Sequence, residues 1–141
     1  MASVPKTDPE IFAQSARSLA RSYGVLTRTK SAEQLICSTK GVLKWVLVLA
    51  SQIDIQSLPG NGWERLLQLQ IDCMSVALML QTPPVDMDAI QTECAQIIGE
   101  YYYLLELTNL RRATLMGRLC PSIQSRRFRK ITQLLSTSGP D

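Results

Sequence analysis

Seven basic residues and no acidic residue lie within the twenty positions from 111 to 130. Six of them are arginine, whose planar guanidinium group binds phosphate through two parallel hydrogen bonds, which a lysine ammonium group cannot do. An aromatic residue lies among them and could stack on a base. The sequence therefore predicts a site for RNA, DNA or another anion, made of Arg111, Arg112, Arg118, Arg126, Arg127, Phe128, Arg129 and Lys130.

Other interpretations of this basic segment are open. Residues 54–106 carry eight acidic side chains and one basic side chain. The basic segment could be a solvated helix face that pairs with this acidic middle, in the same chain or in a neighbouring copy. An anionic membrane surface and a nuclear import signal are further alternatives. The net charge is +4 over residues 1–53, −7 over 54–106 and +6 over 107–141, so we expect a strongly dipolar molecule.

Three consecutive tyrosines form a second candidate site. They are Tyr101, Tyr102 and Tyr103, and three successive positions of a helix cannot all face one core. Tyr101 is in phase with the apolar stripe of its helix, which leaves Tyr102 and Tyr103 as candidates for a partner interface. The alternative is that all three rings cover the edges of the core with their hydroxyl groups in water.

The sequence offers little for catalysis. It contains no histidine, which excludes Ser-His-Asp and Cys-His nucleophile systems and zinc sites that use histidine. Four cysteines occur without a CxxC pair, and the carboxylates at the start of the helix at 86 are explained by its N-terminus. We therefore expect no enzyme, no metal and no cofactor. Enzymatic activity would need a pocket with buried carboxylates or a low-pKa cysteine.

The location expected for the chain is intracellular, in the cytoplasm or the nucleus. Its start, MASVPKTDPE, is polar and does not resemble a secretory signal peptide. The cysteines then serve as small buried apolar residues in a reducing compartment. The most apolar stretch, Gly41–Ala50, is interrupted by Lys44 and is shorter than the roughly 20 residues that a membrane span needs. No integral membrane segment is expected.

Apolar residues recur every three or four positions along most of the chain, which predicts an all-α fold. We expect a single domain, a bundle of four main helices with a short basic C-terminal helix. The expected helices span 8–27, 31–53, 63–81, 86–119 and 122–136, between a flexible arm at 1–7 and a frayed tail at 137–141.

In the first and fourth helices the apolar stripes are Phe12, Ala16, Leu19, Tyr23 and Leu26, and Ile90, Cys94, Ile97, Tyr101 and Leu104. The second helix is expected to begin at a capping box at Ser31 and to carry a narrow polar stripe of Glu33, Cys37, Lys40, Lys44, Leu47 and Ser51, and Asp86 is expected to cap the fourth helix. Extending the apolar stripe of the fourth helix would place Arg112 on it. This helix therefore either breaks near Thr108 and Asn109 or continues beyond the bundle.

Two of these helices, the second and the third, are apolar on most sides. On the third helix, Trp63 is expected to anchor the core, and the apolar side is expected to consist of Trp63, Leu66, Leu67, Met74, Ala77, Leu78 and Leu80. A chain of 141 residues can enclose about one such helix completely. Some apolar surface is therefore expected to lie under another subunit or a partner.

The function that follows from this surplus is a non-catalytic helical interaction or assembly module, which self-associates or binds a protein partner. A homo-oligomer is the expected form. The alternative is a nucleic-acid-binding protein, for example a structural or accessory protein of the viral type, that uses the arginine-rich end of the chain.

Overall fold

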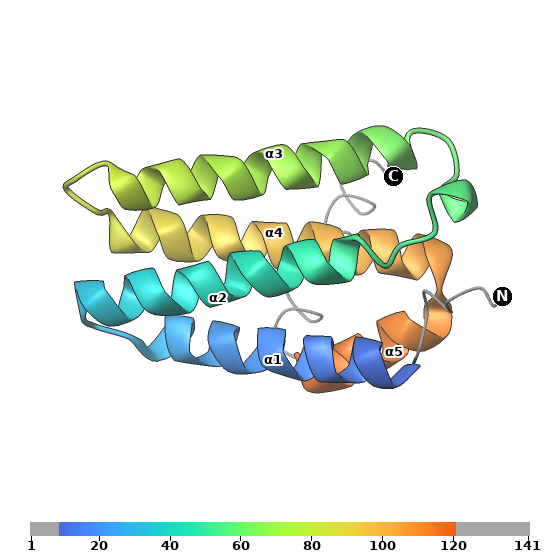
Figure 1. Ribbon diagram of the computed structural model, residues 1–141, viewed down its shortest axis with the longest axis horizontal. Coiled ribbons are helices and arrows are strands. Elements are labelled where there is room, and N and C mark those ends of the chain that lie inside the picture. Colours follow the sequence, from blue (N-terminus) through green and yellow to red (C-terminus); the bar gives the residue numbers. More distant parts are fainter. Residues whose placement is uncertain (1–8, 121–141) are drawn as a thin grey trace, which may run out of the picture.

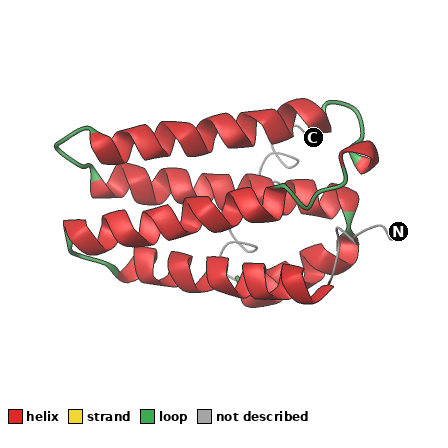
Figure 2. Cartoon of the chain, viewed as in Figure 1, coloured by secondary structure: helices red, strands yellow, loops and turns green. Residues whose placement is uncertain are grey.

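The computed structural model describes residues 9–120, and these residues form helices and loops without any strand (Figure 2). The helices are α1 (Pro9–Arg28), α2 (Ala32–Ala50), α3 (Gly62–Gln81), α4 (Met87–Thr108) and α5 (Leu110–Leu119), with a 3-10 turn η1 at Ile55–Ser57. The all-α fold expected from the sequence is confirmed. The expected arm at 1–7, the basic helix at 122–136 and the tail at 137–141 lie outside the described residues.

The four long helices form two antiparallel hairpins that pack side by side (Figure 1). The first hairpin is α1 with α2, which is the most extensive helix pair of the molecule, and the second is α3 with α4. They meet through α2, which contacts both α3 and α4. Helix α5 turns back after α4 and packs against α4 and α1, whereas α3 forms an edge of the bundle.

Side-chain caps fix where α2 and α4 begin. The hydroxyl oxygen of Ser31 accepts the backbone N–H of Gln34, and the carboxylate of Asp86 accepts that of Ala89. Each cap satisfies a backbone donor of the first turn that has no partner inside its helix. The capping residues expected from the sequence at Ser31 and Asp86 therefore act as caps in the structure.

The interior follows the helical periodicity of the sequence. In α1 and α4 the residues of the predicted apolar stripes are all buried: Phe12, Ala16, Leu19, Tyr23 and Leu26, and Ile90, Cys94, Ile97, Tyr101 and Leu104. The narrow polar stripe predicted for α2 is exposed along its length, including Lys40, Lys44 and Leu47. No helix in residues 9–120 is long and apolar enough to cross a membrane.

The fourth helix expected over residues 86–119 is in fact two helices. The chain leaves the helical path at Asn109, whose backbone is extended with φ −158° and ψ 93°. The side-chain oxygen of Asn109 accepts the N–H of Arg112 at 3.2 Å and so caps α5. A continuous helix would keep Arg112 on the apolar stripe of α4. The break instead lets α5 turn back and bury Ala113 and Met116.

The packing of α2 against α1 leaves no room for a side chain at Gly41. A Cβ atom on Gly41 would lie 2.7 Å from the Oγ atom of Ser22 and 3.2 Å from its Cβ atom. Atoms at such distances overlap, so one of the two helices would have to move. Gly24 is a matched contrast, because a Cβ atom there would meet only the end of the Arg28 side chain, at 3.7 Å.

We expect Gly41→Ala to destabilise the fold and Gly24→Ala to stabilise it. Overpacking costs about 1–3 kcal/mol, which exceeds the roughly 1 kcal/mol that alanine contributes over glycine inside a helix. At Gly24 only the favourable alanine effect applies. Urea unfolding followed by circular dichroism measures both free energies. Equal effects of the two substitutions would show that α1 and α2 leave room for a methyl group at Gly41.

Candidate functional site

Helix α3 turns a row of large apolar side chains to solvent. Trp63 is 55% exposed, Leu67 44%, Ile71 46%, Met74 66% and Leu78 63%. They are three or four residues apart and therefore lie on one face of the helix. We call these five residues the α3 stripe. Single exposed apolar residues are ordinary on protein surfaces, but a continuous row along four helical turns is a candidate binding surface.

The buried face of α3 is a different set of residues. Leu66, Leu69, Cys73 and Val76 are each less than 8% exposed. The expectation that Trp63 anchors the core is therefore wrong. Of the apolar side predicted for this helix, Leu66 is buried, whereas Leu67, Met74 and Leu78 are exposed. The helix has two apolar faces, and contact with α2 and α4 leaves room for only one of them.

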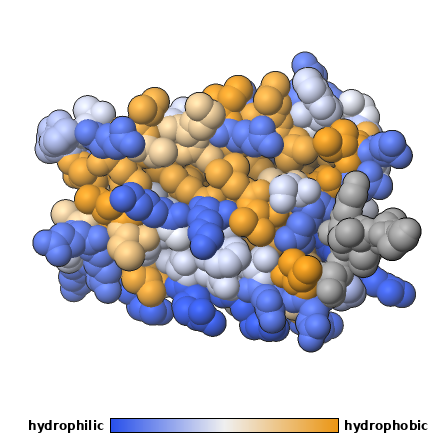
Figure 3. Space-filling model, in the orientation of Figure 1, coloured by the Kyte–Doolittle hydropathy of each residue, from blue (hydrophilic) through white to orange (hydrophobic). Residues whose placement is uncertain are grey.

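The apolar surface continues beyond α3. Figure 3 shows apolar side chains gathered over α3 and along its junction with α2. Leu47 of α2 and Ile55 of η1 are 40% and 55% exposed, respectively. On another side of α3, Arg65 forms an ion pair of 3.3 Å with Glu100 of α4. Helices α3 and α4 carry more acidic than basic side chains, so a partner on the α3 stripe would meet an apolar surface with acidic side chains nearby.

The tyrosine run is divided between the interior and the surface. Tyr101 is completely buried and Tyr102 is 6% exposed, so the ring of Tyr102 belongs to the core. Tyr103 is half-buried, and its ring lies 5.0 Å from the guanidinium carbon of Arg65. Tyr102 faces inward because α4 has neighbours on several sides, namely α2, α3 and α5. Only Tyr103 remains accessible to a partner.

The three basic residues of the predicted anion site that the structure describes do not form one surface. Arg111 and Arg118 are exposed and lie two turns apart on the same face of α5. Arg112 is half-buried and its guanidinium carbon lies 4.8 Å from the centre of the Phe12 ring. The other members, Arg126, Arg127, Phe128, Arg129 and Lys130, lie outside the described residues.

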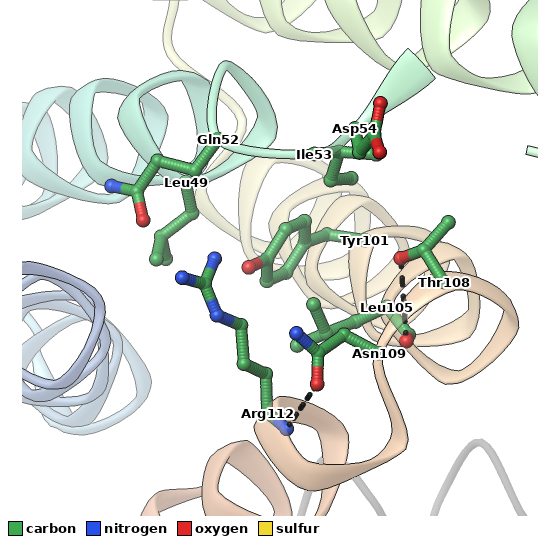
Figure 4. Close-up of a pocket in the computed structure, with 9 residues that line it drawn as sticks. All are labelled: Leu49, Gln52, Ile53, Asp54, Tyr101, Leu105, Thr108, Asn109 and Arg112. Atoms are coloured by element: carbon green, nitrogen blue, oxygen red, sulfur yellow. Dashed lines mark hydrogen bonds between the residues drawn. The ribbon is translucent and has the colours of Figure 1, made fainter. Parts of the chain in front are cut away.

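A small pocket lies where α2 and α4 end and α5 begins (Figure 4). Its volume is about 40 Å³. The guanidinium group of Arg112 points into it beside the hydroxyl group of Tyr101, while the carboxylate of Asp54 at its rim points away from Arg112. The sequence did not predict this pocket. The signal that could have indicated it was a charged residue, Arg112, in phase with the apolar stripe of the preceding helix.

Catalytic groups are scarce in the part of the chain that the structure describes. Residues 9–120 contain no group of three acidic or cysteine side chains that could hold a metal ion. Burial raises the pKa of the Cys73 thiol to about 11, that of Cys94 to about 12 and that of Cys120 to about 11. A thiol with such a pKa is a weak nucleophile near neutral pH, because almost none of it is thiolate.

Comparison with known proteins adds no assignment. Neither a protein-family model, nor a curated protein, nor a solved structure matches the chain. The α3 stripe, the exposed arginines of α5 and the pocket beside Arg112 are therefore the features from which a function can be inferred.

We expect one of the four cysteines to react rapidly with a thiol reagent at pH 8. Cys37 is exposed, whereas Cys73, Cys94 and Cys120 are buried. Ellman's reagent should give one fast equivalent per chain, and Cys37→Ser should abolish it. The other three should react only as fast as the protein opens. Two or more fast equivalents in the native protein would contradict the packing around the buried thiols.

Proposed function

We propose that the protein is a non-catalytic helical interaction or assembly module that self-associates or binds a protein partner through the α3 stripe. The observation that supports this proposal is the second apolar face of α3, which is at least 40% exposed at each of its five positions. This face consists of apolar residues of α3 that the core does not bury.

The geometry of the stripe suits a helix. From Trp63 to Leu78 the helix rises about 22 Å, and the side chains repeat at intervals of three and four residues. Amphipathic helices bind to one another through rows with this repeat. Trp63 offers a large apolar ring and Met74 a flexible side chain, and both residue types are enriched in interfaces.

The free energy available is adequate for association. Each side chain of the stripe has about half of its surface left to bury, which contributes roughly 1 kcal/mol per residue, or about 5 kcal/mol for the five. Leu47 and Ile55 add to this sum if the partner also covers the junction with α2. The loss of translational and rotational freedom opposes association, so the complete surface has to be used.

The variant Leu67→Glu/Met74→Glu tests the proposal, because it places two charges on the stripe. Its control is Thr92→Glu/Gln96→Glu, which adds the same charge at two exposed positions of α4. We expect the unchanged protein and the control to exceed the monomer mass of 15.7 kDa in light scattering at high concentration. The stripe variant should be monomeric, with an unchanged circular dichroism spectrum.

A monomeric unchanged protein would exclude self-association and leave a different partner protein. In that case the three proteins are used as bait in the same cell extract. Partners retained by the unchanged protein and the control, but lost by the stripe variant, would support the proposal. If the stripe variant self-associates or retains the same partners as the control, the α3 stripe is not the binding surface.

Binding of nucleic acid is the second candidate function. Arg111 and Arg118 support it, because both are exposed and no acidic side chain among residues 9–120 lies within 4.0 Å of either. In the sequence they precede the basic run at 126–130. Such a surface would bind phosphates without reading the sequence of bases, and strongly only at low salt.

An electrophoretic mobility shift at low salt tests this second function. Changing Arg126, Arg127, Arg129 and Lys130 together to alanine should remove the shift of an RNA or DNA probe. The control changes Arg17, Arg21, Lys40 and Lys44 to alanine, which removes the same charge from exposed positions of α1 and α2. Absence of any shift for the unchanged protein at low salt would exclude nucleic-acid binding.

A further inference from the structure

The pocket at the start of α5 holds a positive charge without a negative partner in the described part of the molecule. Arg112 is half-buried, and no carboxylate of residues 9–120 lies within 4.0 Å of its guanidinium group. One face of the guanidinium group is covered by Phe12, which is 1% exposed, with 4.8 Å between the guanidinium carbon and the ring centre. A cation that is partly removed from water is costly unless an anion or a dipole compensates it.

A buried hydroxyl group points into the same pocket. Tyr101 is 0% exposed, and its hydroxyl oxygen makes no hydrogen bond to any described residue. Burial raises the pKa of the Tyr101 phenol, and the charge of Arg112 opposes this shift only in part. The hydroxyl group therefore keeps its proton and can donate it to an acceptor in the pocket.

The start of helix α5 forms part of the wall. Asn109 and Arg112 both line the pocket, and α5 is ten residues long. The cap at Asn109 satisfies the N–H of Arg112, which leaves other N–H groups of the first turn without a partner inside the helix. Because the N-cap residue Asn109 lines the pocket, the positive end of the helix dipole is close to it, which favours an anion there.

Two polar groups at the pocket would repel an anion, and the geometry reduces the effect of each. The carboxylate of Asp54 accepts hydrogen bonds from Gln56 N–H and the Ser57 hydroxyl, and it points away from Arg112 (Figure 4). The Oε1 atom of Gln52 is buried without a hydrogen-bond partner in the described chain. Rotation of this amide by 180° exchanges its oxygen and its NH₂ group, and then presents a donor.

We propose that this pocket is a binding site for a single carboxylate group, paired with the guanidinium group of Arg112 and hydrogen-bonded by the Tyr101 hydroxyl group. The volume of about 40 Å³ is enough for one planar carboxylate group. A guanidinium group binds the two oxygens of a carboxylate in one plane. The carboxylate is an aspartate or glutamate side chain, or the end of a peptide chain. The site contains no residue of the α3 stripe, so a test of one surface does not decide the other.

Titration of the full-length protein with sodium acetate, followed by NMR of the arginine Nε–H and backbone amide signals, tests the proposal. Sodium phosphate and sodium chloride at equal ionic strength are the comparison titrations. We expect acetate to shift the Arg112 signals saturably, with an apparent Kd in the millimolar range for so small a probe, about 1–100 mM. A linear shift that is equal for the three salts would mean general screening and would overturn the proposal, as would tighter binding of phosphate than of acetate.

Three variants separate the pocket from general surface charge. Tyr101→Phe keeps the ring and removes the hydroxyl group, so acetate should bind about tenfold more weakly. Arg112→Gln should abolish the saturable shift of the neighbouring amide signals, and Arg111→Gln, the same change at the exposed neighbouring position, should leave it unchanged. If Arg112→Gln does not fold, Tyr101→Phe decides. Unchanged acetate binding in Tyr101→Phe, or an equal loss in Arg111→Gln, would overturn the proposal.

Discussion

A helix packed at the edge of a bundle can turn only one face to the interior, and this limit decides where the apolar surplus of the chain is found. Helix α3 packs against α2 and α4, and the residues that it buries are Leu66, Leu69, Cys73 and Val76. Its second apolar face then has no neighbour among the described helices. The hydrophobic effect that buries one face of α3 is the same force that would hold a partner on the other.

The break at Asn109 brings a polar group, the guanidinium group of Arg112, toward the interior, whereas α3 leaves apolar groups at the surface. By turning the chain back, it allows α5 to cover α1 and α4 with Ala113 and Met116. The same turn carries Arg112 over the ring of Phe12 and next to Tyr101. By closing the apolar core, α5 thus creates a polar pocket at the edge of that core. The same turn leaves Arg112 half-buried, whereas Arg111 and Arg118 are exposed.

Charge plays a smaller part in holding the fold together. Within residues 9–120, Arg65 and Glu100 form an ion pair between α3 and α4, with both side chains more than one third exposed. Such a pair contributes about 0–1 kcal/mol. Five of the eight acidic side chains of residues 54–106 are exposed. For the binding surface proposed on α3, basic residues in the partner would add a favourable electrostatic contribution.

Much of the fold could be predicted from the sequence, because it depends on local periodicity. The stripes of α1 and α4, the polar edge of α2 and the caps at Ser31 and Asp86 lie where the spacing of residue types places them. Each depends on neighbours within one or two helical turns. The surplus of apolar surface was also visible, because it follows from composition and length alone.

Which of two equivalent faces is buried could be decided only by the tertiary structure. Trp63 and Leu66 belong to different rows of α3 that are alike in hydrophobicity, and only the positions of α2 and α4 select the row with Leu66. In the same way, Tyr102 is buried because α4 is surrounded by helices distant in sequence, and Arg112 meets Phe12 across a separation of a hundred residues. Periodicity determines which residues share a face of a helix, whereas long-range packing determines what that face touches.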